Sequence, residues 1–130
     1  GTVTGLAPVS ITSNSVVLRW NQLPNQVDGY EVRLYRGPGL VYVMRFQLSP
    51  SDKNMTTLFY GLDNLMAGVT YNFSVAEIAG SQTGPFVSVL FTTRNLYLNT
   101  DACLRTSVLR GYSIANSKHA YDPNGSKYNR

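Results

Sequence analysis

The sequence predicts an all-β fold, a seven-stranded antiparallel sandwich at residues 1–94 that is followed by a C-terminal tail at residues 95–130. Short runs rich in β-branched and aromatic residues recur about every ten positions between Gly, Pro, Asn and Ser, as in β-sandwiches. No stretch of residues 1–94 has the 3.6-residue periodicity of an amphipathic helix. A loop with one glycine also leads into an alternating strand at Tyr71.

The first three strands are assigned from the alternation of side chains between the two faces of a sheet. The first contains Pro8, which an edge strand tolerates because some of its N–H groups need no partner. Trp20, the only tryptophan, ends the second strand and is expected at the centre of the core. We assign these strands to residues 5–11, 15–20 and 29–35.

Four more strands follow, separated by turn residues. A turn with a permissive backbone is expected at residues 36–39, a polar loop at 49–54 and a flexible loop at 79–85. The strands are assigned to residues 40–46, 57–62, 71–77 and 86–93.

The stretch from Leu65 to Val75 carries the most specific signal for the fold. Tyr71, Phe73 and Val75 fall on one face of a strand. A tyrosine that opens such a strand, six residues after a leucine and three after Gly68, indicates a tyrosine corner. We expect the ring of Tyr71 to be buried and its hydroxyl to bond to the upstream backbone.

Together, these features resemble the fibronectin type III family over residues 3–94: Trp20 ending the second strand, Tyr30 opening the third, the corner at 65–71 and the closing run at 84–93. The sequence departs from the family at Ala67, where proline is usual, and at Val69, where threonine is usual. The resemblance implies an immunoglobulin-like sandwich of two packed antiparallel sheets, three strands against four. It also implies a spacer or binding module of extracellular and cell-surface proteins, without enzymatic activity and without a cofactor.

Charged residues are sparse at 14%, and the formal net charge is +4. Residues 1–94 carry six Lys/Arg against five Asp/Glu, and residues 95–130 carry five against two, so most of the excess lies in the tail. No cluster matches a nucleic-acid-binding patch. No apolar run reaches the ~20 residues that cross a bilayer. We therefore expect no nucleic-acid partner and no membrane insertion.

The tail at residues 95–130 carries no family resemblance. Residues 101–110 are expected to form a short helix with Asp101 as its N-cap, followed by flexible chain. Four of the nine tyrosines lie in the tail, although disordered segments contain few aromatics. The tail therefore either docks, on its own domain, on another copy or on a partner, or it is a linker. In a secreted chain Cys103, the only cysteine, would form a disulfide with another chain or a neighbouring domain.

A catalytic function has little support in the sequence. Cys103 and His119 would supply a nucleophile and a base, but nothing in the tail builds a rigid pocket around them. The seven acidic residues are scattered without metal-ligand spacing. We expect no catalytic site, no metal site and no cofactor.

The first candidate for partner binding is a sheet face. Glu31, Arg33 and Tyr35 point outward from the third strand, and with Tyr42 and Asn72 they would form a polar and aromatic face. Arginine and aromatic residues are enriched in binding hot spots. The alternative is ordinary cross-strand pairing on a solvated face.

The second candidate is the loop at residues 79–85, with Ser81, Gln82 and Thr83 at its tip. Members of the resembled family often present binding residues here, and one fibronectin module carries an integrin-binding Arg-Gly-Asp in this loop. The present loop lacks that tripeptide, and the alternative is a plain hairpin connection.

Three sequons, at Asn54, Asn72 and Asn124, are candidate glycosylation sites if the chain passes through a eukaryotic secretory pathway.

We expect a non-enzymatic binding or adhesion module of a receptor or other secreted or cell-surface protein, with another protein as its partner. The alternatives are a spacer domain linked through Cys103, a homo-oligomer assembled through the tail, and an accessory module of a larger enzyme.

Overall fold

The computed structural model describes residues 1–96, which form eight strands and one short helix. The predicted helix at 101–110, together with Cys103, His119 and Asn124, lies outside the described residues. The elements are β1 (Thr4–Ile11), β2 (Val16–Asn21), β3 (Gly29–Arg36), β4 (Gly39–Gln47), α1 (Pro50–Lys53), β5 (Thr57–Leu62), β6 (Thr70–Ala79), β7 (Gln82–Thr83) and β8 (Val87–Thr92).

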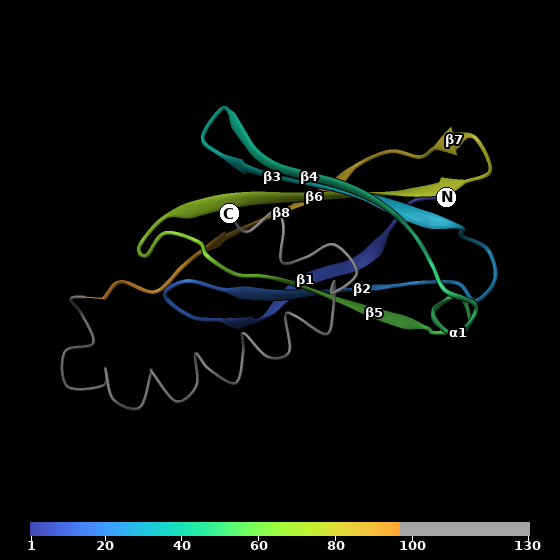
Figure 1. Cartoon of the computed structure of the whole chain (residues 1–130), viewed down its shortest axis with the longest axis horizontal. Coiled ribbons are helices and arrows are strands. Elements are labelled where there is room, and N and C mark those ends of the chain that lie inside the picture. The colour runs from blue at the N-terminus through green and yellow to red at the C-terminus, as the bar shows by residue number, and fades with distance from the viewer. Residues whose placement is uncertain (97–130) are drawn as a thin grey trace. The chain divides into compact units, whose positions relative to one another are not determined.

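The strands form two antiparallel sheets, which confirms the all-β prediction. One sheet has the order β1-β2-β5, and the other has the order β4-β3-β6-β7, with β8 also paired to β6. β3, β4 and β6 lie side by side in the larger sheet (Figure 1). The sheets therefore have three and five strands, because the two-residue β7 adds to the seven that the sequence predicts.

Two predicted loops contain regular structure. The polar loop at 49–54 holds α1, whose N-cap Ser49 accepts a hydrogen bond from the Asp52 N–H, and Pro50 occupies its first turn. A serine cap followed by proline favours helix initiation, so the sequence does carry a signal for this helical turn, where only a loop was predicted. The loop at 79–85 holds β7, which pairs with the end of β6 across the turn at Gly80 (φ +62°).

The chain forms two compact units. The first comprises Gly1–Ala7, Arg19–Leu58 and Tyr71–Phe91. The described part of the second comprises Pro8–Leu18, Phe59–Thr70 and residues 92–96.

The first unit has an aromatic core around Trp20. The Trp20 ring lies 5.2 Å from the Tyr30 ring at 65°, and 6.1 Å from the Phe73 ring at 28°. All three side chains are fully buried. The expectation that Trp20 lies in the core is confirmed.

Gln22 connects this core to the chain around α1. The Tyr30 hydroxyl donates to Gln22 Oε1 over 2.9 Å, and Gln22 Nε2 donates to the Asp52 and Met55 carbonyls over 2.8 and 2.9 Å. Burial of the Tyr30 hydroxyl raises its pKa to about 12. The hydroxyl therefore stays protonated and donates at every physiological pH.

In the second unit, Thr93 fastens the loop that precedes Tyr71. The Thr93 hydroxyl donates to the Met66 carbonyl over 2.6 Å and accepts from the Val69 N–H over 3.0 Å. Gly68 has a φ of +68°, and its N–H donates to the Arg94 carbonyl. A positive φ favours glycine, so Gly68 lets the chain turn here although Ala67 stands where the resembled family usually has proline.

Tyr71 is buried, as the sequence predicts for the tyrosine corner, and its ring stacks on Phe91 at 5.6 Å. The bond from its hydroxyl to the upstream backbone stays a prediction.

Candidate functional site

A β-bulge decides which side chains of β4 face outward. The turn pairs Arg36 with Gly39 and Tyr35 with Leu40, but beyond it Leu34 pairs with Tyr42, so Val41 is an extra residue. Such an insertion moves every later side chain of the strand to the opposite face. The prediction that Tyr42 lies on the outward face is therefore wrong: it is opposite the inward Leu34 and is 8% exposed.

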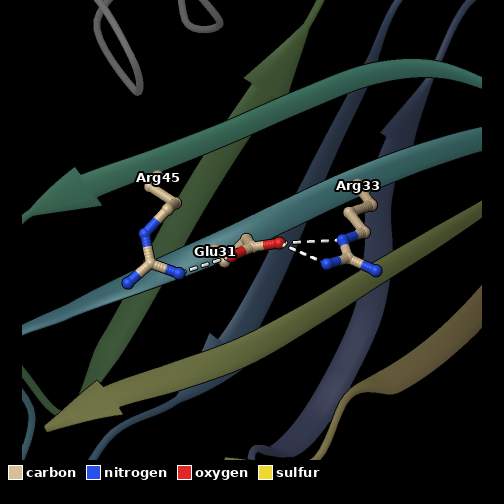
Figure 2. Close-up of polar contacts among 3 residues, drawn as sticks. All are labelled: Glu31, Arg33 and Arg45. Carbon is tan, nitrogen blue, oxygen red and sulfur yellow. Dashed lines mark hydrogen bonds and ion pairs between the residues drawn. The ribbon is translucent and has the colours of Figure 1, made fainter. Parts of the chain in front are cut away.

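The bulge also brings Arg45 opposite Glu31, and Arg33 lies beside them on β3. Arg33 donates from Nε to Glu31 Oε2 over 2.8 Å, with a second nitrogen 2.7 Å from the same oxygen. Arg45 donates to Glu31 Oε1 over 2.6 Å. Figure 2 shows the two guanidinium groups on opposite sides of the carboxylate. We call these three residues the Glu31 triad.

The triad buries its anion and exposes its cations. The side chain of Glu31 is 9% exposed, whereas those of Arg33 and Arg45 are 38% and 55% exposed. Burial alone would raise the pKa of Glu31, but the hydrogen bonds and charges of the two arginines outweigh it and lower that pKa. Hydrogen bonds to Tyr35 and Glu31 raise the pKa of Arg33. The triad therefore presents a net positive charge with fixed donors.

A first prediction concerns acid stability. Because the pKa of Glu31 is lowered on folding, its contribution to stability is present above the unfolded value, about 4.3, and is lost as the pH falls through the folded value. The midpoint of thermal unfolding should fall from pH 6 to pH 3, measured by circular dichroism, and Glu31→Gln should flatten that fall because glutamine does not titrate. Equal pH dependence in the two proteins would contradict this role.

Apolar side chains surround the triad on the same face. The Arg33 guanidinium lies 4.3 Å from the centre of the Phe86 ring, a cation–π contact. Val43 pairs with Arg33 and is 50% exposed. Tyr35 pairs with Asn72 on β6. The Ser74 and Ser88 hydroxyls lie 2.7 Å apart, which places Leu90 of β8, 65% exposed, opposite Asn72.

We call this surface the outer face: Glu31, Arg33, Tyr35, Val43, Arg45, Asn72, Phe86 and Leu90. The structure brings together four of the residues that the sequence assigned to it, Glu31, Arg33, Tyr35 and Asn72. Sequence analysis missed Val43, Arg45, Phe86 and Leu90. The sequence does contain a signal for Arg45. If Tyr42, Met44 and Phe46 share the inward face of the strand, then Val43 and Arg45 must face outward.

The loop tip at Ser81, Gln82 and Thr83 is exposed, as the sequence suggested, but it is anchored at its base. Asp28 Oδ2 accepts from the Gly80 N–H over 2.7 Å, and Asp28 Oδ1 lies 3.2 Å from Lys53 Nζ. The Gly80 hydrogen bond and the Lys53 contact lower the pKa of Asp28. This carboxylate holds the hairpin against the segment that contains α1.

The sequons differ in their surroundings. Asn54 is exposed at the C-cap of α1, and its Oδ1 accepts a hydrogen bond from Asn25 over 3.1 Å. Asn72 is half-buried within β6, and the Ser74 hydroxyl of the same sequon contacts Ser88. Glycosylation at either site stays a prediction.

Reactive groups are sparse in the part of the chain that the structure describes. No cluster of three or more His, Cys, Asp or Glu residues there is arranged to hold a metal ion. Across residues 1–96 no helix has the length and apolar character needed to span a membrane.

These features define a class, an antiparallel β-sandwich module that presents a sheet face and loop tips. The chain belongs to the fibronectin type III family, since the family model described as "Fibronectin type III domain" matches residues 1–93. The resemblance seen in the sequence is thereby confirmed. No curated protein matches the chain.

Solved structures agree with this assignment. A redesigned β-sandwich protein is 28% identical over 72% of this chain and 95% of its own, with a TM-score of 0.56. A two-domain fibronectin type III segment of chicken tenascin is 25% identical over 72% of this chain and 50% of its own, with a TM-score of 0.57. Domains d3–d4 of the rat CD45 extracellular region are 19% identical over 70% of this chain and 48% of their own, with a TM-score of 0.55, a likeness of fold alone.

Fibronectin type III domains are commonly extracellular modules of larger proteins and are typically non-catalytic. The structural neighbours include two domains of an extracellular region.

Proposed function

We propose that this chain is a non-enzymatic binding or adhesion module of a larger secreted or cell-surface protein, and that it contacts another protein through its outer face. The observation that carries the proposal is the Glu31 triad surrounded by exposed apolar side chains. Exposed apolar patches with a polar rim mark interaction surfaces, and arginine with aromatic neighbours is enriched in hot spots.

The geometry of Arg33 favours binding over simple solvation. Its guanidinium is held by Glu31, Tyr35 and the Phe86 ring, yet over a third of the side chain stays exposed. A side chain that is already ordered loses little conformational entropy when a partner docks on it. The net positive charge of the triad favours a partner with carboxylates at this point.

Leu90 supplies the apolar contact that a test can remove. It is 65% exposed, so Leu90→Ser should leave the fold intact while reducing the contact area of the outer face. Leu23 is 71% exposed in the segment between β2 and β3, which makes Leu23→Ser a matched control.

The experiment presents a fluorescent tetramer of the chain to an array of purified secreted and cell-surface ectodomains. We expect at least one ectodomain to bind wild type and Leu23→Ser, and to bind Leu90→Ser about tenfold more weakly. Binding that depends on Leu23 and not on Leu90 would show that the partner contacts the loops and not the outer face. Absence of binding across the array would favour the spacer function instead.

A further inference from the structure

The outer face is net positive, and its cations are the part that solvent reaches. Arg33 and Arg45 are the two cations of the face, and Glu31 is its single anion. The side chain of Glu31 is 9% exposed, against 38% for Arg33 and 55% for Arg45. An incoming group therefore meets guanidinium N–H donors before it meets the carboxylate, so the face is complementary to an anion.

Arg45 is held in place but uses few of its donors. Among the hydrogen bonds of residues 1–96, Arg45 donates from one terminal nitrogen to Glu31 Oε1 over 2.6 Å. A guanidinium has five N–H donors in a planar fork. Figure 2 shows the other terminal nitrogen of Arg45 pointing away from Glu31. A carboxylate that docks on this second edge would receive two parallel hydrogen bonds, the strongest arrangement that arginine offers.

Apolar side chains lie at fixed steps from Arg45. Val43 precedes Arg45 by two residues on β4, so the two side chains share the outer face about 7 Å apart. Leu90 lies on β8, which is separated from β4 by β3 and β6, a distance of about 14 Å across the strands. Phe86 is 36% exposed, and Arg33 stacks on its ring. A ligand that covers the face must therefore place an anion beside apolar groups.

A protein segment fits this surface better than a polyanionic chain. The affinity of a polyanion grows with the number of cations that it contacts, and the outer face offers only Arg33 and Arg45, with Glu31 between them. A sulfated polysaccharide would also leave Val43 and Leu90 without apolar contacts. A segment of a folded partner can combine one carboxylate with apolar side chains, as protein interfaces do.

We propose that the outer face binds a partner segment that places one aspartate or glutamate carboxylate on Arg45 and apolar side chains on Val43 and Leu90. An extended segment presents an acidic and an apolar side chain on one face about 7 Å apart, which matches the step from Arg45 to Val43. The inference rests on the proposed function and deepens it, because it names the chemistry that the partner presents.

The first test uses an ectodomain that the array identifies. Its affinity for Arg45→Gln should be at least about tenfold weaker than for wild type, because glutamine keeps polar atoms but loses the charge and the fork. Arg36→Gln is the matched control, since Arg36 is exposed at the end of β3 and is not part of the outer face. The thermal midpoint of each variant is measured alongside, because Glu31 loses one of its cations in Arg45→Gln.

The second test needs no known partner. A phage-displayed library of random dodecapeptides is selected on the full chain with reductant present. The selected peptides should be enriched in Asp or Glu next to apolar residues, and the enrichment in acidic residues should be lost on Arg45→Gln. Raising NaCl from 50 to 500 mM should weaken their binding to wild type at least about threefold, because salt screens a contact with an exposed cation.

Ectodomain binding that requires Leu90 but tolerates Arg45→Gln would overturn this proposal and leave the proposed function standing. Absence of ectodomain binding would count against the proposed function, and the peptide selection would then decide the present proposal alone. Selection of no peptide, of peptides without acidic residues, or of peptides whose binding ignores salt would overturn it. Retention on heparin–agarose that falls in Arg45→Gln and not in Arg36→Gln would also overturn it, because the anion would then belong to a sulfated polysaccharide.

Discussion

Replacing Trp20 with alanine is expected to lower the free energy of unfolding by about 4 kcal/mol, the cost typical of truncating a buried aromatic side chain. The side chain is fully buried and touches the rings of Tyr30 and Phe73, from two other strands. Its removal leaves a cavity that neighbours in a β-sheet close only partly, because their backbones are fixed by the hydrogen-bond ladder. A domain of this size has little stability to spare.

Urea denaturation measures this loss. Unfolding is followed by far-ultraviolet circular dichroism and not by tryptophan fluorescence, because the substitution removes Trp20, the only tryptophan. Trp20→Phe is the control: it keeps a ring beside Phe73 and should lose less than half as much stability. Equal losses for the two variants would show that the ring contacts do not carry the stability assigned to them.

Replacing Gly29 with alanine should have the second largest effect, a loss of about 3 kcal/mol, at the upper end for overpacking. A Cβ at Gly29 would lie 2.1 Å from the backbone carbonyl oxygen of Phe46, so β4 itself would have to move away from β3. That movement would also disturb the contact between the Phe46 and Tyr30 rings, whose centres lie 6.0 Å apart.

Gly39→Ala is the matched control on the same pair of strands, because its Cβ would meet the Arg36 carbonyl at an ordinary 3.5 Å. Thermal unfolding by calorimetry should show a large fall in midpoint for Gly29→Ala and a small change for Gly39→Ala. Similar midpoints for the two variants would mean that β4 yields at position 46 without cost.

Much of the fold was readable from side-chain alternation. Placing Glu31, Arg33 and Tyr35 outward implies that the alternate residues Tyr30, Val32 and Leu34 face inward, and all three are buried. Trp20 and Tyr71 also lie in the core, as expected. Alternation works here because each strand buries one face, and a slip of one residue would expose the whole apolar set. The short α1 and β7 were missed because four-residue and two-residue elements leave no periodic pattern.

The candidate site was readable only in part, and the bulge at Val41 is the reason. Counting pairs from the turn at residues 37–38 without a bulge would place Tyr42 opposite Arg33 and therefore on the outward face, where the sequence analysis expected it. The inserted residue instead turns Tyr42 inward and brings Arg45 to Glu31. Glu31 is buried despite its outward direction because its two arginines cover it, a consequence of tertiary pairing.

The anchoring of the hairpin at Gly80 has a consequence for how its tip can vary. Asp28 grips the main-chain N–H of Gly80 and no side chain of the tip itself. The residues at 81–83 can therefore be replaced without loss of the hydrogen bond between Gly80 and Asp28, provided that Asp28 and the left-handed Gly80 remain. A hairpin whose base is fixed through its main chain and whose tip can change in sequence suits a display scaffold, in which a constant base supports interchangeable recognition sequences.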